Sequence, residues 1–287
     1  MTHTDGHPTS KSVCLTNGVK LSYYQWSSDQ PNLIFLHPSA GYGLMWDRTA
    51  EYIDSAVQVF ALDQRGHGDS DRPDGSYSAE EYSEDLYLFV TQMGLDKVTI
   101  AGHSLGGRVA QVFAATHPDL TQAILLVGGP HYSNFFAERE RADNVLQGAE
   151  RMRSSQTIFD SEYEALRYFK STRPTDSESA LRHRVRYNCR AMSDGKVETK
   201  YDNVRVAQGL AHMADDLSDY ARRVNCPVAI LRGSLSTHLT YKEALVLATF
   251  WEDARVMEVE GDYSLELDNP EGLSNAILGF SSSIGIL

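Results

Sequence analysis

The sequence has few features of a disulfide-rich, metal-binding or membrane protein. Its 287 residues include three cysteines, Cys14, Cys189 and Cys226, which lie far apart and form no C-x-x-C pair. This arrangement favours reduced thiols over a disulfide framework, and no Cys/His cluster has the spacing of a tetrahedral metal site. No apolar run approaches the ~18 residues of a membrane span, and the polar N-terminus lacks the apolar core of a signal peptide. We therefore expect a cytoplasmic protein with no metal, cofactor or membrane partner.

Positive charge is also scarce. The chain has 26 Lys and Arg residues against 39 Asp and Glu, a formal net charge of −13. A nucleic-acid partner is not expected, because binding phosphates needs a basic face. The hydrophobic content of 41% is typical of globular proteins. A chain of this length can form one large α/β domain or a domain with an insertion.

The most informative stretch of the sequence lies between residues 97 and 117. Residues 98–100 (VTI) are typical of a buried strand, and an apolar-rich helix is expected over 107–115. The pentapeptide GHSLG at 102–106 must turn sharply between them, and its two glycines allow strand and helix to pass close to Ser104. Ser104 then lies at a helix N-terminus, where backbone N–H groups stabilise anions. A G-x-S-x-G motif in this context is typical of a nucleophile elbow.

Apolar strand-like runs alternate with helical segments along much of the chain. Asn17-Gly18 between two alternating runs predicts an N-terminal hairpin with a two-residue turn. With that hairpin, the later runs predict a mainly parallel sheet of about eight strands with helices on both faces. Ligands bind beyond the carboxyl ends of such strands, so the following loops should converge there. The later runs lie at 32–36, 57–62, 98–101, 122–127, 226–231 and 255–259.

Residues 131–217 have a different character. Apolar strand-like runs disappear, charged residues increase, and the spacing of the apolar residues becomes helical. We interpret this stretch as a mostly helical cap inserted over the strand ends. The predicted core then comprises residues 1–130 and 218–287.

Over nearly its whole length the chain resembles the α/β-hydrolase superfamily. The matching stretches, in the family's order, are FLHPSAG, ALDQRGHGDSD, AGHSLGG, CPVAILRG and EGDYSLELDNPE. The resemblance implies that Ser104 is the nucleophile and that the backbone N–H groups of Leu105 and Ser39 form an oxyanion hole. The family usually has glycine where this chain has Pro38, which removes one N–H from that loop.

The resemblance fails at two positions of the catalytic triad. Thr237 stands where the family has an aspartate, Tyr263 stands where it has the histidine, and Gly128 occupies an alternative acid position. A serine hydroxyl needs an adjacent base, whereas a phenol with a pKa of about 10 is almost fully protonated at pH 7. Loss of the base costs on the order of 10⁴–10⁶ in turnover. Ordinary ester hydrolysis should therefore be slow or absent.

Several other residues are candidates for the site. His238, next to Thr237, is the best candidate for a substitute base, since a small loop movement would bring it to Ser104. His37, Trp46, His103 and His131 are candidate substrate-binding residues. An ordinary role in loop hydrogen bonding or core packing is the competing interpretation for each of them.

Three functions remain open from the sequence. The first is an enzyme that acts on a small apolar carbonyl compound, such as an ester, lactone or polyketide-like molecule, by lyase, cyclase or isomerase chemistry. The second is a serine esterase, lactonase or thioesterase with inactivating triad substitutions. The third is a non-catalytic protein that binds a small molecule on the same fold. The retained G-x-S-x-G turn favours an enzyme.

Overall fold

The computed structural model describes residues 8–26, 31–128 and 138–287. An eight-stranded sheet has the order β1-β2-β4-β3-β5-β6-β10-β11. Strands β3 to β11 of this sheet pair in parallel, and β2 pairs antiparallel with both β1 and β4. The prediction of a mainly parallel sheet of about eight strands is confirmed. Its strands are β1 (Thr9–Cys14), β2 (Lys20–Trp26), β3 (Asn32–Leu36), β4 (Gln58–Asp63), β5 (Val98–His103), β6 (Thr121–Val127), β10 (Val228–Gly233) and β11 (Ala254–Val259).

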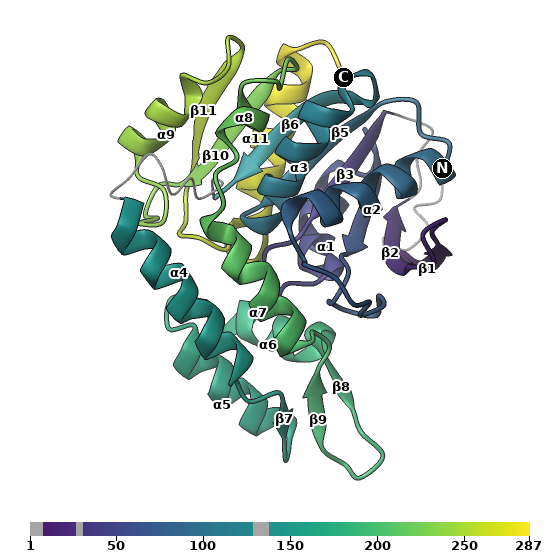
Figure 1. The fold of residues 1–287 in the computed structure, drawn as a ribbon, viewed down its shortest axis with the longest axis vertical. Helices are drawn as coiled ribbons and strands as arrows, with labels where there is room; N and C mark the ends of the chain where they lie inside the picture. The colour runs from purple at the N-terminus through teal and green to yellow at the C-terminus, as the bar shows by residue number, and fades with distance from the viewer. Residues whose placement is uncertain (1–7, 27–30, 129–137) are drawn as a thin grey trace.

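Helices cover both faces of the sheet (Figure 1). Successive side chains of a strand point to opposite faces, so Ile34 and Leu36 pack in one apolar cluster while Leu33 and Phe35 pack in the other. Both clusters are buried, which explains why the strands are apolar without interruption. The first cluster includes side chains of α2 (Ala79–Gln92), α3 (Leu105–Thr116), α8 (Ser218–Ala221) and α9 (Tyr241–Ala248), and the second those of η1 (Gly43–Trp46), α1 (Asp47–Ile53), α10 (Leu265–Asp268) and α11 (Pro270–Ser283).

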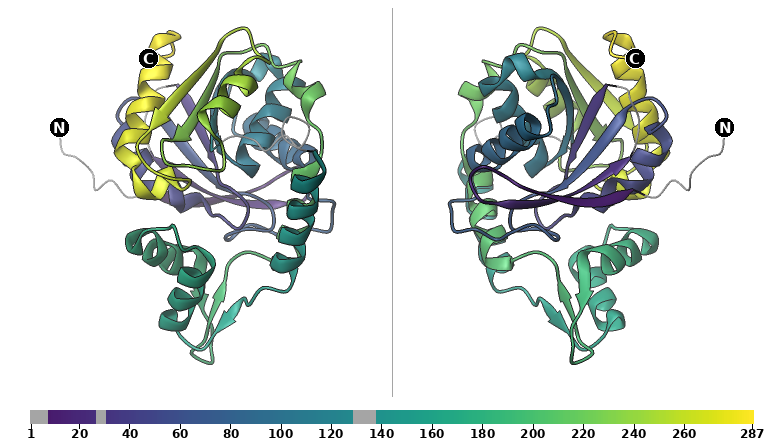
Figure 2. Two further views of the ribbon diagram at one scale, coloured as in Figure 1. Left: turned by 90° about the vertical axis from the view of Figure 1, so that its left-hand side faces the viewer. Right: turned by 90° about the vertical axis from the view of Figure 1, so that its right-hand side faces the viewer.

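Residues 138–214, which we call the helical segment, lie below the carboxyl ends of the parallel strands (Figures 1 and 2). Phe159, Phe169 and Leu181 belong to a separate small core within it. The segment also contains a three-stranded sheet, which the sequence did not predict because strands of two or three residues are too short for a recognisable alternation. Its elements are α4 (Glu138–Arg153), β7 (Ile158–Phe159), α5 (Glu162–Thr172), α6 (Glu178–Asn188), β8 (Cys189–Ala191), β9 (Val197–Thr199), α7 (Asn203–Ala211) and η4 (His212–Ala214). No helix in the described ranges is long and apolar enough to cross a membrane.

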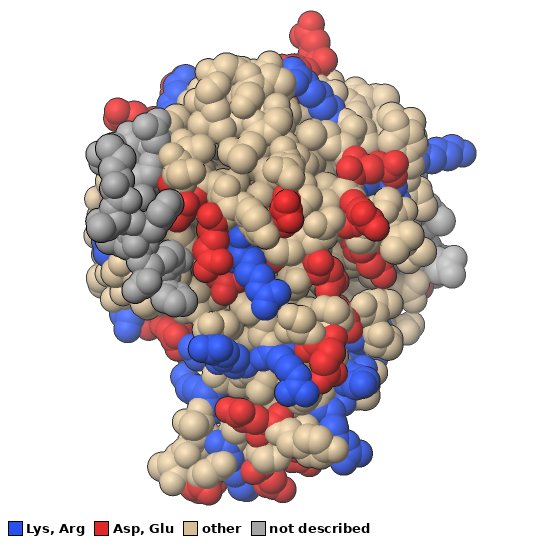
Figure 3. Space-filling model, turned by 180° about the vertical axis from the view of Figure 1, so that it is seen from behind, with Lys and Arg blue, Asp and Glu red and all other residues tan. Residues whose placement is uncertain are grey.

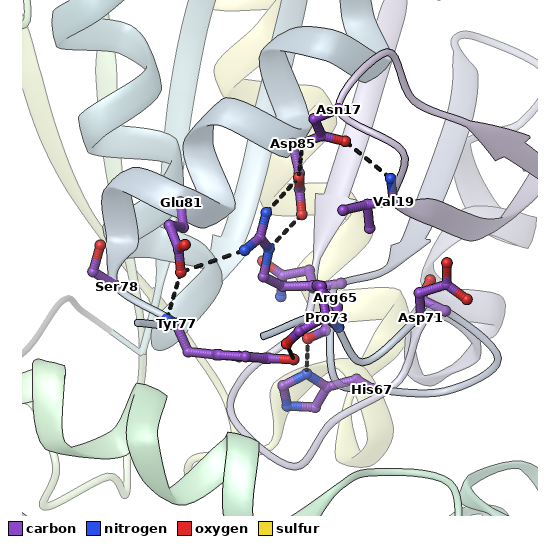
Figure 4. Close-up of polar contacts among 12 residues, drawn as sticks. Asn17, Val19, Arg65, His67, Asp71, Pro73, Tyr77, Ser78, Glu81 and Asp85 are labelled. Atoms are coloured by element: carbon purple, nitrogen blue, oxygen red, sulfur yellow. Dashed lines mark hydrogen bonds and ion pairs between the residues drawn. The ribbon is translucent and has the colours of Figure 1, made fainter. Parts of the chain in front are cut away.

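The N-terminal hairpin is present, but the prediction of a two-residue turn is wrong. Beyond the Cys14–Lys20 pair, the Leu15 N–H donates to the Val19 oxygen and the Gly18 N–H donates to the Leu15 oxygen, both at 2.9 Å, so three residues, 16–18, connect the strands. The Asn17 side chain accepts the Val19 N–H at 3.1 Å and donates to Asp85 of α2 at 3.0 Å (Figure 4). The contact with Asp85 anchors this turn to α2, and Gly18 supplies the positive φ of 86° that lets the chain return to the second strand.

Candidate active site

Ser104 occupies the sharp turn between β5 and α3. Its backbone has φ 51° and ψ −106°, a combination that non-glycine residues rarely adopt and that often marks a functional site. The backbones around it are very close, since a Cβ added to Gly102 would lie 2.2 Å from the Gly106 carbonyl and one added to Gly106 would lie 2.3 Å from the Leu36 oxygen. Only glycine fits at both positions, so this local sequence determines how Ser104 is presented.

Tyr263, which follows β11, is the partner of Ser104. The phenol forms a hydrogen bond with the Ser104 side chain. Burial raises the pKa of Tyr263 to about 12, although the Ser104 hydrogen bond and the charge of Arg173 act in the opposite direction. The phenol is therefore protonated at neutral pH, so it can donate a proton but is a poor acceptor for the Ser104 proton.

Two histidines flank the Tyr263 ring. The ring centroids of His103 and His238 lie 4.4 Å and 4.3 Å from the centroid of Tyr263. His238 is exposed on the loop after β10. Burial lowers its pKa, and the nearby Asp262 carboxylate acts in the opposite direction. His238 therefore contacts Tyr263, and Tyr263 is the residue hydrogen-bonded with Ser104.

His103 is paired with a carboxylate that the sequence analysis missed. Its Nδ1 donates to Glu266 Oε1 at 2.9 Å, and both side chains are almost completely buried. Among the described residues, the buried Nε2 has no hydrogen-bond partner. It lies against Gly128, where an added Cβ would be 2.9 Å away. This histidine–carboxylate pair therefore lies in the wall of the site, with Nε2 directed towards the end of β6.

Two other histidines hold the loop that follows β3. The Nε2 atom of His37 accepts the Gln64 N–H at 3.0 Å, and its Nδ1 lies 2.8 Å from the Pro38 oxygen. His67 Nε2 accepts the Ala40 N–H at 3.1 Å, and its Nδ1 lies 2.9 Å from the Arg65 oxygen. Burial lowers the pKa of both, that of His67 to about 4. Both rings are neutral at pH 7 and hold backbone groups of the loop. His37 is not among the described residues that line the cavity over Ser104, so its role in substrate binding stays a prediction.

The loop that carries His67 is itself anchored to α2. The Arg65 guanidinium donates to both carboxylate oxygens of Asp85, at 2.6 Å and 2.7 Å, and lies 3.3 Å from Glu81 (Figure 4). Glu81 also accepts the Tyr77 N–H at 2.6 Å. Helix α2 therefore supports His67, which in turn fixes the position of the loop containing Ser39 and Ala40. A rigid loop of this kind can hold backbone N–H groups in a constant position for a ligand.

A cavity of about 310 Å³ opens over Ser104. Loops after three parallel strands contribute to it, as expected for the carboxyl ends of such a sheet, and the helical segment supplies the opposite wall. No acidic residue occurs among its described lining residues. These are Pro38, Ser39, Met45, His103, Ser104, Val145, Gly148, Met152, Arg173, Arg184, Leu210, Met213, Tyr263 and Ser264.

Some predicted site residues lie elsewhere. Trp46 is completely buried and stacks on Phe35 with ring centroids 4.4 Å apart. Its neighbour Met45 lines the cavity and Trp46 does not, so the role of Trp46 in substrate binding stays a prediction. Thr237 is exposed and does not line the cavity. His131 falls outside the described residues. Sequence reasoning also missed Arg173 and Arg184, which lie in the stretch interpreted as a charged helical surface.

Residues 31–205 match the family model described as the alpha/beta hydrolase fold. Because this match spans more than half of the chain, the chain belongs to the α/β-hydrolase fold family. The family and its named relatives also support the expectation that the chain is an enzyme.

Several relatives are named as esterases or hydrolases. The chain is 26% identical to the esterase Rv0045c of Mycobacterium tuberculosis, covering 90% of this chain and 85% of the esterase. It is also 26% identical to a 2-(acetamidomethylene)succinate hydrolase of Mesorhizobium japonicum, with 87% of each chain covered. The crystal structure of an E-2-(acetamidomethylene)succinate hydrolase has a TM-score of 0.86 at 24% identity, covering 96% of this chain and 100% of the other. At that identity the structural likeness shows the shared fold.

Proposed function

We propose that this chain is an enzyme that binds a small carbonyl compound over Ser104 and acts on it by proton transfer from Tyr263, without an acyl-serine intermediate. The observation that carries the proposal is the Tyr263 phenol, hydrogen-bonded with Ser104 and with its pKa raised to about 12. A protonated phenol at this point is a proton donor. It leaves the serine hydroxyl without the base that nucleophilic attack requires.

The oxyanion hole of the proposal uses two backbone N–H groups. Leu105 is the first residue of α3, so its N–H has no partner within the helix and points along the positive end of the helix dipole. In the loop after β3, the Ala40 N–H binds His67 and the Gly41 N–H binds the Pro38 oxygen at 2.9 Å. This leaves Ser39, which lines the cavity, as the second donor. One such donor contributes about 10²–10³ in rate.

The resulting chemistry is activation of the carbonyl group. The two N–H groups stabilise negative charge on the carbonyl oxygen, and the phenol protonates the oxygen or a departing group as a bond next to the carbonyl breaks or rearranges. Lyase, cyclase and isomerase reactions need this charge stabilisation but no nucleophilic serine. His238, exposed beside Tyr263, returns the proton to the phenol from solvent.

A second candidate is a slow serine hydrolase. Its support is the naming of the relatives as an esterase and as a hydrolase of a succinate derivative, which contains a cleavable acyl group. His103 with Glu266 supplies a histidine–carboxylate pair in the wall of the site. For this candidate, the His103 ring must turn from Gly128 towards Ser104, with Tyr263 moving aside.

The two candidates differ in which hydroxyl matters. We expect Tyr263→Phe to lower turnover about 10²-fold, because it removes the proton donor and keeps the ring, while Ser104→Ala lowers it less than about tenfold. Turnover is followed by proton NMR on carbonyl compounds incubated with the purified enzyme, and short p-nitrophenyl esters serve as a hydrolysis control. A serine hydrolase gives the opposite result. In that case Ser104→Ala abolishes both carbonyl-compound turnover and p-nitrophenyl ester hydrolysis, and Tyr263→Phe has little effect on either.

A further inference from the structure

The charged residues that line the cavity over Ser104 are basic, although the chain as a whole is acidic. The protein has a net charge of −13, yet Arg173 and Arg184 line the cavity and its described lining includes no acidic residue. At the surface the pattern is different. Basic and acidic side chains lie beside each other on the face drawn in Figure 3, and some exposed arginines form ion pairs, as Arg182 does with Glu178 and Arg190 with Glu198.

Arg184 of α6 is buried without a full set of partners. Only 2% of its side chain is exposed. Nη1 lies 3.4 Å from the Ala40 oxygen, Nη2 lies 3.7 Å from Asp176 Oδ2, and the guanidinium stands 5.9 Å from the Tyr42 ring centre. The Nε atom has no hydrogen-bond partner among the described residues. A buried guanidinium has five N–H donors to satisfy, so this one has donors available to a molecule in the cavity.

Arg173, just after α5, adds a second cation beside the first. Repulsion by Arg184 is the largest cause that lowers the pKa of Arg173 to about 10, with burial acting in the same direction and Asp176 opposing it. Arg173 is still protonated at pH 7. The Asp176 carboxylate is the acid that faces both guanidiniums, and it also accepts from the Ser264 hydroxyl at 3.4 Å. Glu266, a second buried carboxylate near the cavity, is paired with His103 instead. The two guanidiniums therefore share the Asp176 carboxylate, which favours binding of an anion in the cavity.

We propose that Arg173 and Arg184 bind a carboxylate of the substrate, so that the enzyme acts on carbonyl compounds that also carry a carboxylate. Guanidinium groups bind carboxylates in paired, charge-assisted hydrogen bonds. The remainder of the molecule packs against the apolar lining of Met45, Met152 and Leu210. This narrows the expectation of an apolar substrate to one with an apolar body and an acidic end. The position of the carbonyl over Ser104 rests on the proposed function, whereas the anion site rests on the two arginines.

The test measures binding, by isothermal titration calorimetry, of 4-phenyl-2-oxobutanoate and of its neutral methyl ester. We expect the acid to bind at least tenfold more tightly than the ester. Arg184→Met, which keeps an unbranched side chain but removes the guanidinium and its charge, should abolish this preference, and Arg184→Lys should retain part of it. Arg186→Met is the matched control, because Arg186 is an exposed arginine on the same helix that does not line the cavity. It should leave the preference unchanged.

Three outcomes would overturn the carboxylate site: failure of the acid to bind, equal binding of acid and ester, or an equal loss of preference in Arg184→Met and Arg186→Met. Thermal denaturation confirms that each variant folds, and the Arg173→Met variant provides a second test if Arg184→Met does not. If the corresponding phosphonate binds tenfold more tightly than the carboxylic acid, the site is assigned to phosphate-type anions instead. Because binding is measured without turnover, a retained preference with no reaction leaves the anion site standing and contradicts the proposed function.

Discussion

Replacing Tyr263 with histidine should convert Ser104 into a reactive nucleophile. We expect Tyr263→His to increase the rate of Ser104 labelling by a fluorophosphonate on the order of 10², and to give measurable hydrolysis of p-nitrophenyl acetate, because the imidazole replaces a protonated phenol next to the hydroxyl. Glu266, whose charge already acts on the Tyr263 site, is the carboxylate available to stabilise the imidazolium. Intact-protein mass spectrometry follows the labelling, with Ser104→Ala as the blank.

Two further variants make this result specific. Tyr263→Phe removes the phenol without adding a base and should leave labelling unchanged. Adding Thr237→Asp to Tyr263→His should change the rate less than about threefold, because residue 237 is exposed and outside the cavity. If Tyr263→His labels no faster than Tyr263→Phe, then the missing imidazole is not what limits Ser104.

The tight turn around Ser104 should tolerate no added side chain. We expect Gly106→Ala to lower the free energy of unfolding by more than about 3 kcal/mol, because its methyl group would lie 2.3 Å from the Leu36 backbone oxygen, and neither backbone can move without shifting β3 or α3. Urea denaturation followed by circular dichroism measures the effect. Labelling of Ser104 in the folded fraction reports on the turn itself.

Gly279 provides the matched control for this prediction. It lies in α11, and an added Cβ there would have no neighbour within 4 Å. Gly279→Ala should therefore stabilise the protein by about 0.5–1 kcal/mol, because alanine is the better helix former. Similar unfolding energies for the two variants would show that the close approach of Gly106 to β3 is not a strong constraint.

The parts of the fold that the sequence predicted are those with local signals. The apolar runs at 32–36 and 98–100 predicted strands because a strand buried on both faces needs no polar alternation. The turn at Ser104 was predictable because both glycines that it requires lie within one stretch of five residues. The short strands β7, β8 and β9 gave no such signal, and the Asn17 contact with Asp85 joins residues far apart in the chain.

The site was predictable only where the family motifs specify a residue. Ser104 and Tyr263 lie together as the order of the motifs implied. Glu266 was missed because its partner His103 is 163 residues away, and only its position between two leucines hinted that it is buried. Arg184 was missed because its stretch of α6 is rich in charged residues that are typical of a solvated helix face. Trp46 illustrates why aromatic residues near a site are ambiguous in a sequence: such a residue packs in the core, as Trp46 does, as readily as it lines a cavity.

The pH dependence of fluorophosphonate labelling tests most directly whether Ser104 lacks a base. With the pKa of Tyr263 raised to about 12, the phenol keeps its proton throughout the neutral range. The labelling rate of the unaltered protein should therefore stay low and nearly constant from about pH 6 to pH 9, because no group hydrogen-bonded with the hydroxyl loses a proton there. A rate that rises through about pH 6.5 to a plateau equal to that of Tyr263→His would show an imidazole acting on Ser104 and would contradict the account.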